Sequence, residues 1–386
     1  MLDLVINSSI QHTLLLFIPL LFAVILKLSK VRSWSLLAGV LGGVLLGPAV
    51  FGSIAPSYWE GLFQGGVSAH VQYEQFVEQQ NADFIAAKDR GVNETVLLQL
   101  KADQHYDRAQ KEQAWVAATW KDQRTLRDYV IVLIILIFLS GTVRGKVRGT
   151  APPMMSLSVG VWAAIIPCGI TALLVIWFLD SNVASALAFG ACLAAGPWTL
   201  TRWEQKAADD SEQGGAALML RCGHVAWLTA SCIALYATWH SLGAMSFVWL
   251  LPLLCLPFMW RIPSKQWKLL TLFVDYAAIP SVMATCLVLI HPIEDLALWP
   301  IVIVIIFCAD ARWLGGIIGL GILGGRESGS AMRLATPLVD AGISQLCMAA
   351  LLFGAGVLTP SFTLAVLLGA VFLDRTASIR MKFAKN

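Results

Sequence analysis

Long runs of apolar residues, separated by short polar connections, extend along nearly the whole chain. A helix that crosses a hydrocarbon core of about 30 Å needs roughly 20 apolar residues. Most of the runs reach or approach that length, and the pattern therefore predicts about eleven transmembrane helices. They are expected at residues 12–29, 34–54, 129–143, 154–179, 183–200, 216–239, 243–260, 269–290, 299–323, 334–357 and 361–379.

One long polar segment, residues 57–128, interrupts this pattern and holds 19 of the 51 charged side chains. From residue 66 onward it contains no proline and is rich in Gln, Ala, Glu, Lys and Asp, a composition that favours helix. Because Gly91-Val92-Asn93 breaks it once, we expect a hairpin of two helices above the membrane, the second running on into the third transmembrane helix. Two interpretations remain open: a solvated spacer that shields the outer face, or a docking surface for another protein.

The composition indicates a polytopic membrane protein of the all-α class. The chain is 58% apolar and 13% charged, against roughly 45–50% and about 25% in soluble domains. This excludes a water-soluble globule and makes the lipid bilayer the expected partner. The net charge of +3 gives no indication of nucleic-acid binding. The eight cysteines form no CxxC pair, and HExxH, GxSxG and phosphate-binding loop motifs are absent, so we expect no metal, no cofactor and no enzymatic activity.

The basic residues predict the orientation, because short cytoplasmic loops are enriched in Lys and Arg. Alternate connections carry 17 of the 27 basic residues, and the opposite short connections carry none. The N-terminus is therefore expected outside and the C-terminus in the cytoplasm, with residues 57–128 on the extracytoplasmic side of a bacterial inner membrane. The 17 residues are Lys27, Lys30, Arg32, Arg144, Lys146, Arg148, Arg202, Lys206, Arg261, Lys265, Lys268, Arg326, Arg333, Arg375, Arg380, Lys382 and Lys385.

Two of the predicted helices carry helix breakers near the middle of the membrane. The fifth contains Ala195-Gly196-Pro197, and the tenth contains Thr336-Pro337. Breakers of this kind free backbone groups that only a polar cavity or a partner helix can satisfy. The predicted topology makes the two helices antiparallel, as an inverted repeat requires, and such paired interruptions are typical of transporter binding sites.

Four sequence motifs together indicate one class of membrane protein. An early Gly-rich helix spans Ala38–Pro48, the fifth helix carries Gly196-Pro197, the sixth carries Cys222-Gly223-His224, and the ninth carries Arg312-Trp313-Leu314-Gly315. In these motifs the chain resembles the cation/proton antiporter superfamily of sodium/hydrogen and potassium/hydrogen exchangers. The resemblance implies a sodium/proton antiporter-like inverted repeat with two crossed broken helices, exchange of a monovalent cation for a proton by alternating access, and a homodimer.

The same resemblance divides the chain into five parts. The first three, seventh and eighth helices would form the scaffold, and the fourth to sixth and ninth to eleventh helices would form two repeats of a core that moves against it. The expected parts are 1–56 for the first two helices, 57–128 for the hairpin, 129–240 for the third helix and first core repeat, 241–298 for the seventh and eighth helices, and 299–386 for the second core repeat and cytoplasmic tail.

The candidate site residues are ionisable groups expected inside helices, where a charge is costly unless it is paired or hydrated. Where the family carries its ion-binding carboxylate, this chain has His224, which can carry a proton near neutral pH. We expect Asp340, at the break of the tenth helix, to replace that carboxylate. Asp310 lies two helical positions from Arg312 and points about 200° away from it. Arg312 is therefore expected to neutralise the broken-helix ends or Asp340.

Two functions compete on these grounds. The first is a secondary transporter, an antiporter of monovalent cations and protons with a histidine in place of the carboxylate. Its histidine and arginines near helix ends also leave an anionic substrate open. The second is a non-transporting membrane subunit or sensor that binds a partner protein through residues 57–128. The missing carboxylate pair and the large insertion favour the second function.

Overall fold

In the part of the chain that the computed structural model describes, the regular secondary structure is helical and there is no strand. Five of its helices are long and apolar enough to cross a membrane, or six if one bent pair is counted as a single span. The expected helix at 243–260 lies outside the described residues. The structure describes residues 2–63, 67–144, 152–179, 181–197, 215–242, 267–304, 309–323, 325, 327–339 and 342–383.

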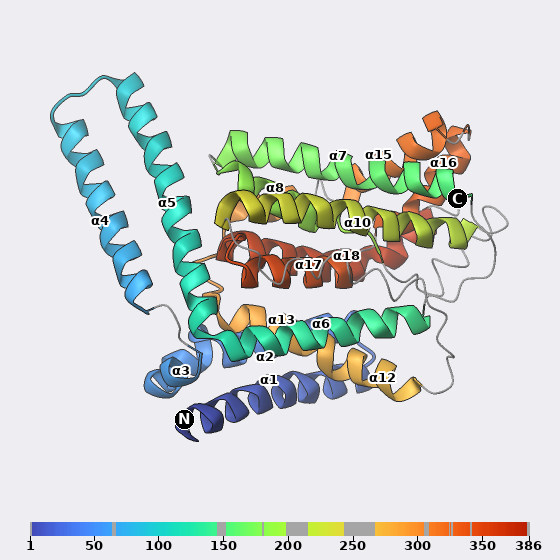
Figure 1. Ribbon diagram of the computed structural model, residues 1–386, viewed down its shortest axis with the longest axis horizontal. Coiled ribbons are helices and arrows are strands. Elements are labelled where there is room, and N and C mark those ends of the chain that lie inside the picture. Colours follow the sequence, from blue (N-terminus) through green and yellow to red (C-terminus); the bar gives the residue numbers. More distant parts are fainter. Residues whose placement is uncertain are drawn as a thin grey trace.

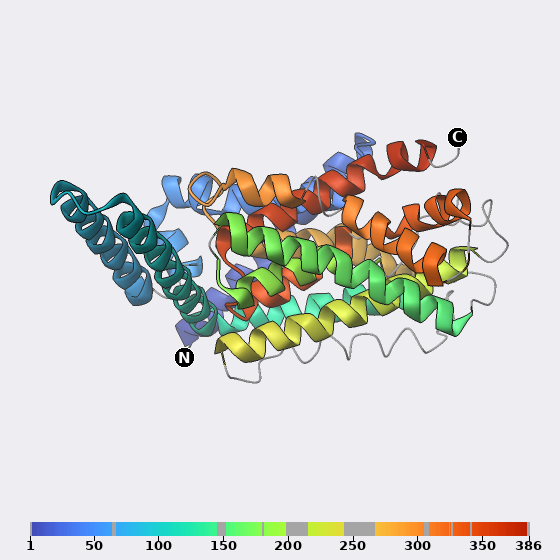
Figure 2. The same cartoon turned by 90° about the horizontal axis from the view of Figure 1, so that it is seen from above.

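The apolar helices run side by side as one bundle, and the two helices of the polar segment project from one end of it (Figure 1). The N-terminus lies at this hairpin end, whereas the C-terminus lies at the opposite end. Figure 2 shows the same arrangement from above, with the hairpin still outside the bundle. This architecture, with its exposed apolar helices, defines an α-helical integral membrane protein.

One layer of the bundle, at the bottom in Figure 1, contains the first helices of the chain, α6 and the helices before α14. Hydroxyl groups link its helices: Ser281 Oγ donates to the carbonyl of Leu15 at 2.6 Å and lies 2.7 Å from Tyr129 Oη. Paired hydroxyls of this kind hold helices together where the hydrophobic effect between them is weak. The layer consists of α1 (Leu2–Leu28), α2 (Trp34–Leu46), η1 (Pro48–Gly52), α6 (Arg124–Arg144), α12 (Lys268–Phe273), η4 (Val274–Ala278) and α13 (Ile279–Val288).

The other layer is built around α7, against which α8, α10 and α15 pack. Most residues of α8 and nearly all residues of α17 are buried, so these two short helices lie at the centre of the protein. The layers meet where α17 and α18 contact α13. This layer consists of α7 (Pro153–Leu179), α8 (Val183–Ala194), α10 (Gly215–Leu242), α14 (Leu298–Ile303), α15 (Ala309–Ile318), η6 (Gly319–Leu323), α16 (Ser328–Ala335), η7 (Thr336–Val339), α17 (Gly342–Gly354) and α18 (Pro360–Phe383).

The polar segment forms the predicted helical hairpin. After α3 (Pro56–Phe63), α4 runs from Val67 to Asp89 and α5 from Glu94 to Asp122. The turn falls at the predicted break: Gly91 has a φ of +71°, and Asn93 caps α5 by accepting a hydrogen bond from the backbone N–H of Thr95 at 3.2 Å. The two helices are tied together where Arg108 Nε donates to Gln80 Oε1 at 2.7 Å.

The prediction that the second hairpin helix continues into the third transmembrane helix is wrong. α5 ends at Asp122 and α6 begins at Arg124 in a different direction (Figure 1). Gln123, between them, has φ −92° and ψ 41°, outside the helical region. Its side chain accepts a hydrogen bond at 3.0 Å from Gln11 Nε2, which also donates to the carbonyl of Leu62 at 2.9 Å. These contacts with α1 and α3 explain the bend, and sequence periodicity gives no sign of them.

Candidate functional site

The first interrupted helix is α8, which ends at Ala194, six residues before its expected end. Asn182 caps its start, where Oδ1 accepts a hydrogen bond from the backbone N–H of Ser185 at 2.7 Å. At the other end Ala195, Gly196 and Pro197 are buried and not helical, as the breakers predict. The chain therefore loses its helical hydrogen bonds inside the bundle, and the carbonyl groups at the end of α8 need other partners.

Arg312 supplies one of those partners. It belongs to α15 and is 0% exposed, and its Nη1 donates to the carbonyl of Ala195 at 3.1 Å. The carbonyl end of a helix carries a partial negative charge, so a guanidinium group there gains both a hydrogen bond and a favourable electrostatic interaction. The guanidinium group of Arg312 therefore lies at the end of the first interrupted helix.

The unwound segment after α8 lies directly against α10, which supplies the glycine before His224. A Cβ atom on Gly223 would lie 2.2 Å from the carbonyl oxygen of Pro197, and one on Gly196 would lie 2.4 Å from the carbonyl oxygen of Gly223. The two backbones lie so close together that only the hydrogen atom of a glycine fits between them, so both positions require glycine. His224 itself is half-buried, next to this contact.

The second interruption lies where α16 and η7 meet α17. The helical axis turns by 50° between 329–339 and 342–354, as expected for a broken span. Thr336 and Pro337 are buried in η7, and Thr336 Oγ1 donates to the carbonyl of Met332 at 3.0 Å. η7 packs against both α10 and α15, so the second break faces the helices that carry His224 and Arg312.

Not every predicted site residue can be placed in this arrangement. Asp340 lies outside the described residues. Asp310 is the second residue of α15, and its side chain also lies outside the described part. Of the four ionisable candidates, the structure places the side chains of Arg312, at the end of α8, and of His224, beside the contact with Pro197.

A polar cluster that the sequence did not predict joins the hairpin to the bundle. Gln113 of α5 donates through Nε2 to Ser185 Oγ and, at 3.0 Å, to the carbonyl of Val357. Ser185 Oγ donates to the same carbonyl at 3.0 Å, and Asn182 Nδ2 donates to Gln113 Oε1 at 3.3 Å. All three side chains are buried. The cluster thus holds α5 against the start of α8 and the segment that follows α17.

This contact reaches the hairpin-side ends of both interrupted helices. Gly356, two residues after α17, has a φ of +72°, and a Cβ atom there would lie 2.7 Å from Ala117 Cβ of α5. The loop after α17 is therefore pressed against the hairpin. One Gln among several in a polar helix gave no signal of this role, because its partners come from segments distant in sequence.

In the part of the chain that the structure describes, no three His, Cys, Asp or Glu residues gather as metal ligands. Neither known family models nor curated proteins match the chain. The geometry of the two interrupted helices therefore carries the functional argument.

Proposed function

We propose that this protein is a secondary transporter of the cation/proton antiporter type that works by alternating access. The observation that carries the proposal is the hydrogen bond from buried Arg312 to the carbonyl of Ala195 at the end of interrupted α8. Paired helix interruptions of this kind hold substrate and coupling ions in transporters. A charged side chain inside a membrane is costly, and such residues typically mark substrate or ion pathways.

The proposal includes the finer architecture expected from the sequence. It takes eleven transmembrane helices, an inverted repeat whose two interrupted helices are α8 and the α16–η7–α17 segment, and a homodimer. It takes an N-terminus outside a bacterial inner membrane and a cytoplasmic C-terminus. The position of the termini at opposite ends of the bundle is consistent with an odd number of helices.

Charge decides which ions the site can take. Arg312 is a fixed positive charge, so a monovalent cation would bind only if a carboxylate balances it, and Asp340 is the candidate in our proposal. His224 would carry the proton, because an imidazole changes charge near neutral pH. Without such a carboxylate the same site would favour an anion.

Proton movement in reconstituted vesicles tests the proposal. Purified protein is challenged with Na⁺, K⁺, Li⁺ and simple anions while a pH-sensitive dye reports the lumen. We expect cation-evoked proton flux that His224→Ala abolishes. Arg221→Ala is the matched control, because Arg221 lies on the same helix but is exposed, and we expect it to keep the flux. Asp340→Asn should also abolish it; full activity of that variant would exclude Asp340 as the carboxylate.

A second set of variants separates charge from packing at Arg312. Arg312→Lys keeps a cation and should retain part of the activity. Arg312→Met leaves the carbonyl of Ala195 without its donor, which costs about 1–3 kcal/mol for a buried group, and should abolish flux. If Arg312→Met transports like the parent protein, the guanidinium group has no part in the mechanism.

The Gln113 cluster favours a second candidate function, a non-transporting subunit or sensor that receives a partner through the hairpin. Buried hydrogen bonds attach α5 to the start of α8 and to the loop after α17, where a moving core would have to slide. Absence of any ion-evoked flux in both the parent protein and Gln113→Leu would favour this function. Flux that appears only in Gln113→Leu would instead identify the hairpin as a brake on a transporter.

A further inference from the structure

Two carboxyl groups from distant parts of the chain meet where the hairpin rests on the bundle. Glu112 belongs to α5, and Asp295 belongs to the loop between α13 and α14. Both act on the phenol of Tyr73 on α4: burial, and then the negative charges of Glu112 and Asp295, raise the pKa of Tyr73 to about 12. Tyr73 therefore stays neutral, and the three side chains form one cluster that joins the hairpin to the loop.

The junction around this cluster contains a cavity of about 380 Å³. Tyr73 lines it from α4, Trp115 and Val116 line it from α5, and Asp295 lines it from the loop. Glu112 lies three and four positions before Trp115 and Val116, so it occupies the same face of α5. The hairpin and the loop thus face each other across a cavity, and their packing is incomplete.

The cations nearest to Glu112 in sequence are directed toward α4 and not toward the loop. Arg108, one turn before Glu112 on α5, donates from Nε to Gln80 Oε1 at 2.7 Å. The ammonium group of Lys111 lies 5.6 Å above the ring of Phe76. Gln80 and Phe76 both belong to α4. These two contacts hold the hairpin together, and they leave its junction with the loop to the acidic groups.

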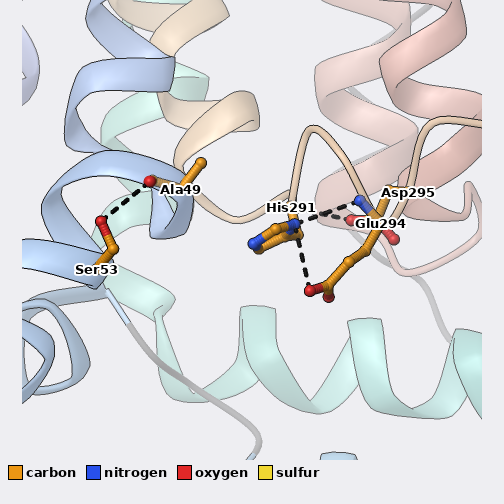
Figure 3. Close-up of polar contacts among 5 residues, drawn as sticks. All are labelled: Ala49, Ser53, His291, Glu294 and Asp295. Carbon is orange, nitrogen blue, oxygen red and sulfur yellow. Dashed lines mark hydrogen bonds and ion pairs between the residues drawn. The ribbon is translucent and has the colours of Figure 1, made fainter.

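The loop and α4 present further charged groups to this junction. Figure 3 shows Glu294 and Asp295 beside His291 in the loop. Asp295 Oδ2 accepts a hydrogen bond from the backbone N–H of His291 at 2.7 Å, and His291 Nδ1 lies 3.6 Å from Glu294 Oε1. Glu74 is exposed on α4 and lines the cavity. When His291 is protonated, its charge is directed to Glu294, so it does not separate Glu112 from Asp295.

Glu112 responds to this environment by holding a proton. Burial, and then the negative charge of Asp295, raise the pKa of Glu112 from an ordinary 4.5 to about 8 while the hairpin is docked. If the hairpin separates from the loop, water reaches Glu112 and its pKa returns to the ordinary range. Because the docked hairpin binds this proton more tightly, docking becomes less favourable as the pH rises from 4.5 to about 8.

The neighbouring residues connect this event to the bundle. Gln123, between α5 and α6, is not helical and supplies a point about which α5 can turn. Gln113, next to Glu112, donates to Ser185 Oγ and to the carbonyl of Val357. Movement of α5 away from the loop would therefore break the contacts that hold the start of α8 and the segment after α17.

From this arrangement we propose that the hairpin is a proton-controlled device, docked on the bundle while Glu112 is protonated and released when Glu112 ionises opposite Asp295. Release frees the start of α8 and the segment after α17. The pH of the compartment that the hairpin faces would thus act on the ends of both interrupted helices. The inference concerns the position of the hairpin and applies whether or not the protein transports ions.

The size of the effect follows from the two pKa values of Glu112. With about 8 in the docked hairpin and 4.5 in the released one, the ratio of docked to released protein falls roughly 100-fold between pH 6 and pH 9. Most of this fall lies below pH 8, because above that pH Glu112 has lost its proton in both states.

Distances between two spin labels, measured by double electron–electron resonance on the purified full-length protein, test this proposal. One label is placed at Gln99 on α5 and the other at Leu298 at the start of α14, both of which are exposed. Introduced ketone-bearing amino acids carry the labels, so the native cysteines stay unchanged. We expect a population with a changed distance to grow between pH 6 and pH 9. Identical distance distributions at the two pH values would overturn the proposal.

Variants assign the response to Glu112. Glu112→Gln cannot ionise and should keep the pH 6 distribution at pH 9. Asp103→Asn is the matched control: Asp103 is exposed on α5, and nine positions from Glu112 place it on the opposite face, so this variant should respond like the parent. Asp295→Asn keeps an acceptor for the N–H of His291 but removes the charge, and should respond less than the parent. A response of Glu112→Gln equal to that of the parent would contradict the inference.

Discussion

Replacing Gly223 by alanine tests the closest contact in the membrane site. The new Cβ atom would lie 2.2 Å from the carbonyl oxygen of Pro197, more than 1 Å inside the 3.4 Å at which ordinary contact begins. Both partners are backbone, so no side chain can rotate away. Overpacking of a core costs about 1–3 kcal/mol, and this geometry places Gly223→Ala at the upper end of that range. The unwound segment must separate from α10, which would also disturb the neighbouring carbonyl of Ala195.

The assay is thermal unfolding of purified protein in detergent, followed by tryptophan fluorescence or by loss of the monodisperse peak. Gly169→Ala on α7 is the matched control, since a Cβ atom there meets nothing within 4 Å. We expect Gly169→Ala to be neutral or slightly stabilising, whereas Gly223→Ala lowers the melting temperature by several degrees. If the two variants melt alike, the described contact between Pro197 and Gly223 is wrong.

Three further predictions concern the hairpin. The pKa of Glu112 is raised from an ordinary 4.5 to about 8. The folded protein therefore retains a proton that the unfolded chain releases, so the free energy of unfolding should fall as the pH rises from 4.5 to about 8. Glu112→Gln should reduce that decline in the free energy of unfolding, by roughly 2–4 kcal/mol at pH 8. Melting curves recorded against pH would show the difference. A parallel decline in both proteins would refute the raised pKa of Glu112. Gln113→Ala removes buried hydrogen bonds and should lower the free energy of unfolding by about 2–3 kcal/mol. Amide hydrogen exchange in the C-terminal half of α5 should become faster, and unchanged exchange would contradict this prediction. Gly356→Ala should destabilise by about 1–3 kcal/mol, since its φ is +72° and Ala117 blocks a Cβ atom; a melting temperature equal to that of the parent would contradict this.

The sequence predicted those features that depend on local pattern. Apolar runs of sufficient length marked the long helices, and Gly91 with Asn93 marked the hairpin turn because one adopts positive φ and the other caps a helix. Gly196 and Pro197 marked the end of α8, since proline cannot continue a helix in the membrane interior without a partner for the freed carbonyl. Each of these signals acts within a few residues.

Features that depend on distant segments could not be predicted. The bend at Gln123 depends on Gln11, and the Gln113 cluster depends on Ser185 and Val357. Nothing in the local composition of α5 distinguishes Gln113 from the other glutamines of that helix. A cavity of about 380 Å³ between the hairpin and the bundle is lined by residues of six helices and one loop, so its aromatic residues resembled interfacial anchors when considered one at a time.

The straight, 29-residue α5 gives the hairpin the properties of a lever. At 1.5 Å per residue it is about 43 Å long, and Gln113 lies about 15 Å from the bend at Gln123, a third of the way to the turn. A shift of 1 Å at the ends of α8 and α17, transmitted through Gln113, would therefore move the turn at Gly91 by about 3 Å. A probe attached at that exposed turn would read small rearrangements inside the bundle at threefold magnification.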